Sequence, residues 1–118
     1  MTDPDQHCPG LACFELLGRK WTPQIVWALL DGPRRFSALL ASVPGLSDKV
    51  LTRRLAELER AGIVTRAQYA EIPPRVEYTL TRSGLALRGV IGEMERWSTQ
   101  HAGADATARS RTAARRRS

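Results

Sequence analysis

The sequence predicts a mainly helical domain with one small β-hairpin, and three patterns lead to this fold class. Residues 63–69 and 76–80 are rich in strand-forming side chains and flank a stiff Pro-Pro pair, as in a hairpin. Before the hairpin stand two amphipathic helical patterns joined by a Pro-Gly turn at 44–45. After it, another helical pattern begins at Thr81. Two helices joined by a tight turn and followed by a hairpin form the arrangement of a winged helix-turn-helix.

Three helices are expected before the Pro-Gly turn at 44–45, and the third of them is the first helix of the helix-turn-helix. Pro9 suits the first turn of a helix that ends at Gly18. Thr22 is expected to cap a second helix, with Pro23 at its first position. Trp21 and Trp27 flank this helix as expected core anchors. In the third, which begins near Arg35, Ser37 is the candidate cap.

The helix predicted from Ser47 to Ala61 has an apolar face and a cationic face. Ser47 is a favourable N-cap, and Asp48 in the first turn complements the helix dipole. At about 100° per residue, the leucines at 51, 55 and 58 share one face. The opposite face carries Lys49, Arg53, Ala56 and Arg60, with Thr52 beside them and Arg54 at the flank.

A cationic helix face is often no more than a solvated surface, but its place in a helix-turn-helix favours DNA contact. The second helix of that motif reads base edges with its N-terminal residues. We therefore expect Lys49 and Arg53 to contact guanine O6 and N7, and Thr52 to reach a base or a phosphate. Ser47 could bind a phosphate through its hydroxyl and backbone N–H. Arg54, at the flank of the cationic face, is a further candidate for DNA contact.

The hairpin carries an arginine, Arg75, directly after its Pro-Pro tip. Narrow minor grooves attract arginine, so Arg75 is a candidate minor-groove contact. It could also pair with Glu71 or Glu77 across the hairpin, and the two interpretations are compatible. Weaker candidates for contact with the DNA backbone are Arg66 on the first strand and Arg34 and Arg35 before the helix-turn-helix.

The last predicted helix, of about 20 residues after Thr81, carries more apolar surface than a small core needs. Leu85 lies off its main stripe, whose members are Leu87, Val90, Ile91, Met94 and Trp97. This surface either covers the core of the monomer or forms a dimer, and we favour the dimer.

Charge and composition separate the ends of the chain from its middle. The net charge is +6, and from residue 105 onward five arginines against Asp105 give +4, so the first 104 residues carry only +2. We expect a disordered N-terminus at 1–7, one domain at 8–101 and a flexible Arg-rich tail at 102–118. The tail either attracts phosphates or only improves solubility.

With no long apolar run and no secretory signal, a cytoplasmic protein without membrane contact is expected.

The sequence lacks the residue patterns of common enzymes and metal sites. It has no Ser/His/Asp set, no Walker-type phosphate loop and no HExxH motif. The two cysteines, Cys8 and Cys13, form no CxxC, and His7 and His101 lie near the ends. We therefore expect no enzyme activity, no metal and no cofactor.

Together these features closely resemble the HxlR-type family of bacterial winged-helix transcription regulators. The resemblance covers roughly residues 8–98, and its departures are Arg19, where a glycine is common, and the Arg-rich tail. The matching segments are Cys8-Pro9, Leu17–Trp21 (LGRKW), Gly32–Leu39 (GPRRFSAL), Pro44–Leu55 (PGLSDKVLTRRL), Leu58–Val64 (LERAGIV), Pro73–Thr81 (PPRVEYTLT), Gly84 and Trp97.

The resemblance implies a MarR-like winged helix-turn-helix that dimerises through its first and last helices. The expected dimer contacts are Leu11, Phe14, Leu85, Met94 and Trp97. Some family members sense electrophiles or oxidants through a cysteine in a Cys-Pro setting, and Cys8 matches that position. A nearby helix N-terminus favours the thiolate, although Cys8 could equally be a thiol without a regulatory role. Cys13 is expected to be a small core residue.

The function expected from these observations is a homodimeric, sequence-specific DNA-binding regulator. It would act as a repressor on a palindromic operator in double-stranded DNA and would respond to thiol oxidation or electrophiles through Cys8. The alternative is a winged-helix module that binds protein or RNA and has no redox sensing.

Overall fold

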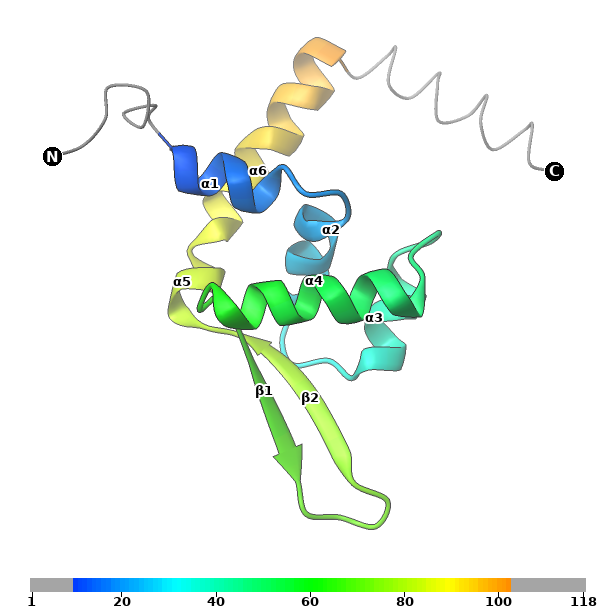
Figure 1. The fold of residues 1–118 in the computed structure, drawn as a ribbon. Coiled ribbons are helices and arrows are strands. Elements are labelled where there is room, and N and C mark those ends of the chain that lie inside the picture. Colours follow the sequence, from blue (N-terminus) through cyan, green and yellow to red (C-terminus); the bar gives the residue numbers. More distant parts are fainter. Residues whose placement is uncertain (1–9, 103–118) are drawn as a thin grey trace, which may run out of the picture. The chain divides into compact units, whose positions relative to one another are not determined.

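The computed structural model describes residues 10–102, which fall into two compact units that divide after Leu87 and are described separately. Predictions on residues 1–9 and 103–118, Cys8 among them, lie outside the described residues. Figure 1 shows the elements, which are α1 (Leu11–Leu17), α2 (Thr22–Leu29), α3 (Phe36–Ser42), α4 (Asp48–Arg60), β1 (Val64–Tyr69), β2 (Arg75–Leu80), α5 (Arg82–Leu85), α6 (Leu87–Trp97) and the π-helical turn η2 (Ser98–Ala102). The mainly helical fold with one hairpin is confirmed.

The core of the first unit consists of aliphatic side chains from its helices and from the base of the hairpin. A fully buried leucine or isoleucine stabilises the fold by roughly 1.5–3 kcal/mol. The side chains with almost no exposed surface are Ile25, Val26 and Leu29 of α2, Leu39 of α3, Leu51, Leu55 and Leu58 of α4, and Val64 of β1. The leucine stripe predicted for the helix at 47–61 therefore faces inward.

Helix α4 begins and ends where its sequence predicts. The Ser47 hydroxyl accepts a hydrogen bond from the Val50 backbone N–H at 3.2 Å, and Asp48 lies in the first turn. At the other end Gly62 has φ +75°, a backbone conformation that side chains disfavour. These end signals fix which residues of α4 point outward.

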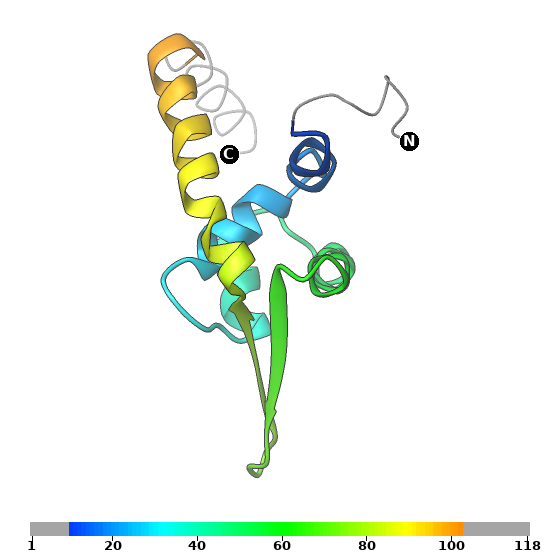
Figure 2. The ribbon, with the colours of Figure 1, turned by 90° about the vertical axis from the view of Figure 1, so that its left-hand side faces the viewer.

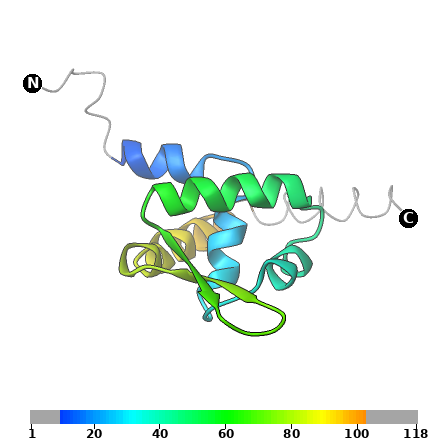
Figure 3. The same cartoon turned by 60° about the horizontal axis from the view of Figure 1, so that its bottom comes forward.

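Strands β1 and β2 form an antiparallel hairpin that projects from the α4 end of this unit (Figures 2 and 3). The register pairs Val64 with Leu80 and Tyr69 with Arg75. Arg34 extends the sheet by a single bridge to Tyr78, with N···O distances of 3.0 and 2.8 Å. This bridge could not be predicted, because one extended residue carries no alternating pattern.

Three local predictions about the first helices are wrong. Trp21, with φ 79°, occupies the N-cap position of α2, and Thr22 is the first helical residue, 2% exposed. Trp27 is 48% exposed, because it lies roughly 160° around the helix from the buried Leu29. Ser37 lies inside α3, whose N-cap position is Arg35.

The predicted final helix is also divided, because α5 ends after one turn and Ala86 separates it from α6. The Thr81 hydroxyl accepts from the Gly84 backbone N–H and donates to the Gly62 carbonyl at 2.6 Å. A side chain on Gly84 would collide with the Ile63 carbonyl oxygen. These contacts bind α5 closely to the start of β1.

Candidate nucleic-acid interface

Helices α3 and α4 form the helix-turn-helix (Figure 1). The polar side chains in the N-terminal half of α4 are exposed. Ser47, Lys49 and Arg53 are exposed. The side chains of Lys49 and Arg53 make no hydrogen bond or ion pair with another described residue. Thr52 is also exposed and donates its hydroxyl proton to the Asp48 carbonyl at 2.8 Å, so its oxygen remains an acceptor. This surface can therefore meet an anionic partner without first breaking ion pairs.

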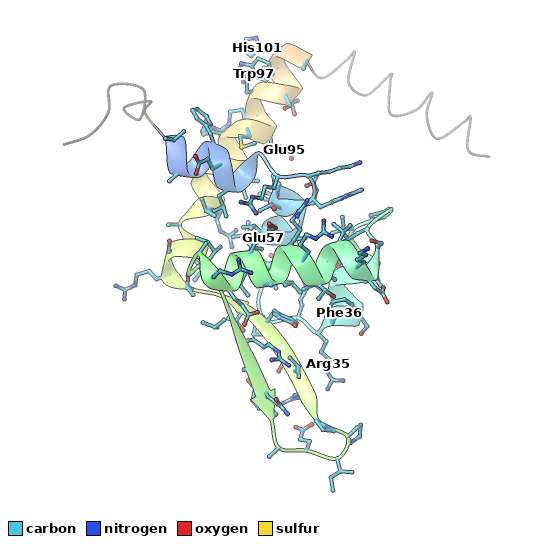
Figure 4. All side chains as sticks on the ribbon, in the orientation of Figure 1. Arg35, Phe36, Glu57, Glu95, Trp97 and His101 are labelled. Atoms are coloured by element: carbon cyan, nitrogen blue, oxygen red, sulfur yellow. The ribbon has the colours of Figure 1, made fainter. Side chains whose placement is uncertain are left out.

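Arg54 differs from its neighbour Arg53, because its guanidinium group is engaged within the protein. Its Nε donates to the Lys20 carbonyl at 2.8 Å, and its Nη1 lies 2.9 Å from Glu57 Oε1. The other carboxylate oxygen of Glu57 pairs with Arg19 (Figure 4). Arg54 thus connects α4 to the segment between α1 and α2, and its geometry favours a positioning role over a DNA contact.

On the hairpin, Arg75 lies against three neighbouring side chains. Its Nη2 is 3.3 Å from Glu71 Oε1 and its Nε is 3.5 Å from Glu77 Oε1. Its guanidinium carbon lies 4.3 Å from the centre of the Tyr69 ring, at a distance typical of a cation–π contact. The side chain is 31% exposed. The predicted pairing with the glutamates is therefore present, and Tyr69, directly opposite in the register, is a partner that sequence reasoning missed.

The other predicted cations lie on different faces of the same unit. Side chains alternate between the two faces of a strand, and Arg66 shares the face of Val64 whereas Arg75 shares the opposite face with Ala67. Arg66 is exposed. Arg35 follows the Arg34 bridge to β2 and is exposed as well (Figure 4). Arg34 is held instead, because its Nε donates to the Ala28 carbonyl at 2.6 Å.

Large apolar side chains are exposed in both units, each considered by itself. In the first unit Phe14 is 64% and Leu85 48% exposed, and Leu11 is partly exposed. In the second unit Met94 is 45% and Trp97 60% exposed, whereas Ile91 of the same helix is buried. Trp97 also packs against His101, with ring centres 5.6 Å apart (Figure 4). The predicted dimer contacts are thus largely accessible in a single chain.

Cys13 is a free thiol on α1, partly exposed rather than in the core as expected. It borders a hollow of about 550 Å³ between α1 and the C-terminal half of α4, together with Leu16, Arg19 and Leu58.

Within residues 10–102 no cluster of His, Cys, Asp and Glu is placed to hold a metal ion. No helix in this range is long and apolar enough to cross a membrane.

The family is decided by comparison with known proteins. The model of the HxlR-like helix-turn-helix family matches residues 16–106. The chain belongs to this family. It is also 44% identical over 94 residues to the HTH-type transcriptional regulator YodB of Bacillus subtilis, covering 79% of this chain and 84% of YodB. As a member of the HxlR-like family, it is a transcription regulator and not an enzyme.

Solved structures of HxlR-like and related regulators share the fold. Reduced YodB from B. subtilis superposes with a TM-score of 0.72 at 40% identity, covering 86% of this chain and 95% of that chain. YodB is also known after diamide treatment and with quinone bound, at TM-scores of 0.68 for both. The redox regulator HypR in its oxidised form gives 0.73 at 34% identity, covering 80% and 97% of the two chains. MarR-family regulators are similar too, which confirms the winged-helix arrangement.

Proposed function

We propose that this HxlR-like regulator acts in the cytoplasm as a homodimeric repressor that binds a palindromic operator. The N-terminal half of α4 would enter the major groove, where Lys49 and Arg53 would contact guanines. Ser47 and Thr52 would contact phosphates or bases. The observation that carries this proposal is the pair of exposed cations Lys49 and Arg53, which have no ion-pair partner among residues 10–102 and lie opposite the buried leucines of α4.

The hairpin would serve as the wing in the neighbouring minor groove. Arg75 would leave Glu71, Glu77 and the Tyr69 ring for the groove. Its ion pairs are partly exposed, and ion pairs at the protein surface contribute only about 0–1 kcal/mol each. A minor groove with a strong negative potential can therefore compete for the guanidinium group. Arg66 and Arg35 would contact the flanking phosphates, where arginines fix position and do not read sequence.

We infer the dimer from the exposed apolar side chains at the two ends of the domain. A soluble monomer rarely exposes large apolar side chains in groups. A two-fold symmetric dimer would present two α4 helices to two half-sites, which explains why a palindromic operator is expected. The proposed contacts are Leu11, Phe14, Leu85, Met94 and Trp97.

We also propose thiol control through Cys8. The Cys8-Pro9 pair in the sequence supports this proposal. Relatives whose structures are described as diamide-treated, quinone-bound or oxidised support it as well. Oxidation or an adduct at Cys8, just before α1, would change how α1 packs in the dimer. The spacing of the two α4 helices, and with it operator affinity, would then change.

Selection of bound duplexes from a random DNA pool, with and without diamide, tests the whole proposal. We expect an enriched palindrome whose half-sites lie about one helical turn apart, and we expect oxidant to weaken the enrichment. Selection of no common sequence by the reduced protein would contradict sequence-specific binding. Equal enrichment with and without oxidant would contradict the thiol control alone.

A further inference from the structure

The tip of the hairpin, residues 72–74, is apolar although it protrudes into solvent. Between Glu71 and Arg75 stand Ile72, Pro73 and Pro74, all exposed. Ile72 is 102% exposed, which means that no described part of the chain covers its side chain. Figures 1 and 2 show the loop at the far end of the hairpin, away from the helices of the first unit.

The tip is also restricted in its backbone. The Glu71 N–H donates to the Tyr69 carbonyl at 2.9 Å directly after β1, and two consecutive prolines fix φ directly before β2. A tip with little conformational freedom loses little entropy when it is held in a groove. It can therefore present an apolar side chain to a partner at small cost.

DNA offers a matching surface at this place. The walls of the minor groove are the sugar rings of the two strands, which present apolar surface. Proteins that bind this groove often bring apolar side chains such as Ile or Pro into it, where some enter between base steps. Arg75 begins β2 directly after the tip, so a wing whose arginine enters the groove carries Ile72 with it. The partner that suits this apolar tip is thus the same groove that would attract Arg75.

We propose that Ile72, supported by Pro73 and Pro74, forms an apolar wedge that packs against the deoxyribose walls of the minor groove. The inference rests on the proposed DNA-binding function and adds an uncharged contact to it. Such a contact releases no counterions, so its contribution does not depend on salt. This property separates Ile72 from Arg75, whose contribution falls as salt rises.

The test measures the affinity of full-length variants for one duplex obtained by the selection above, at several salt concentrations. Ile72→Ser should weaken binding about fivefold at every salt concentration, the effect of burying roughly half of the side chain. Arg75→Ala should weaken binding and also lower the slope of log K against log salt by about 1. Ile72→Leu, which keeps an apolar tip, should bind within about twofold of the wild type.

Because Ile72 is fully exposed, Ile72→Ser should leave the melting temperature and the dimer unchanged, so a folding defect cannot imitate the result. Unchanged affinity in Ile72→Ser, or a loss accompanied by a shallower salt slope, would overturn the wedge. Failure of the proposed function is distinguishable, because the wild type itself would then show no duplex binding that Arg53→Ala weakens.

Discussion

Arg54 Nε donates a hydrogen bond to the Lys20 carbonyl oxygen at 2.8 Å, across 34 positions of the chain. The same guanidinium group reaches Glu57, and Glu57 also pairs with Arg19. The adjacent side chains of Arg53 and Arg54 on α4 therefore have different surroundings. Arg53 is exposed to solvent, whereas Arg54 joins α4 to the segment between α1 and α2.

The first prediction separates these two arginines. Arg54→Ala removes a partly buried contact with Glu57 and an exposed hydrogen bond to the Lys20 carbonyl, so the free energy of unfolding should fall by about 1–2 kcal/mol. For a domain of this size this lowers the melting temperature by about 4–8 °C per kcal/mol. Arg53→Ala is the matched control and should change the stability by less than about 0.5 kcal/mol. Equal melting temperatures of the two variants in thermal denaturation would contradict the positioning role of Arg54.

The second prediction concerns two glycines near the end of the fold. Gly84→Ala should destabilise the protein by about 1–3 kcal/mol, because the new methyl group would meet the Ile63 carbonyl and lie 2.9 Å from Leu80 Cδ2. Gly89→Ala on α6 meets no described atom within 4 Å and should stabilise the helix by about 0.5–1 kcal/mol. Urea unfolding of both variants measures this difference in sign. A tolerated Gly84→Ala would mean that α5 does not pack closely on Ile63.

The third prediction addresses the dimer. Replacing Phe14 and Trp97 by Ser should shift the protein towards the monomer in sedimentation experiments at micromolar concentration. Both side chains are exposed in the single chain, so the dimer interface would lose the apolar surface that they bury in it. Ile72→Ser, which also removes an exposed apolar side chain but from the hairpin tip, should leave the dimer intact. A Phe14→Ser/Trp97→Ser variant that sediments as the wild type does would exclude these side chains from the interface.

The fourth prediction addresses the thiols. Diamide or a quinone should lower the operator affinity of the wild type and of Cys13→Ser, because both keep Cys8, the proposed sensing thiol. Cys8→Ser should bind equally with and without oxidant. An oxidant effect of the same size in Cys8→Ser would remove Cys8 from the mechanism, and its loss in Cys13→Ser would assign sensing to the thiol beside the hollow.

Local signals in the sequence predict much of this fold and of its candidate site. The cap at Ser47, the leucine stripe of α4 and the glycine at 62 depend on neighbouring residues, so the helix and its outward cations could be deduced directly. The contacts of Arg54 with Lys20 and of Arg34 with Tyr78 join residues far apart in the chain and leave no periodic signal. The close packing of Gly84 on Ile63 and the break between α5 and α6 at Ala86 likewise leave no periodic signal.

We propose that Arg53 on α4 and Arg75 on the wing bind DNA jointly, and a double variant tests this most directly. The affinity of the Arg53→Ala/Arg75→Ala variant for the selected duplex should be measured against salt beside the wild type. We predict a loss of about 100-fold or more and a slope of log K against log salt that is shallower by about 1–2. Unchanged affinity and slope in a variant that still folds and dimerises would contradict the assignment of this surface to DNA.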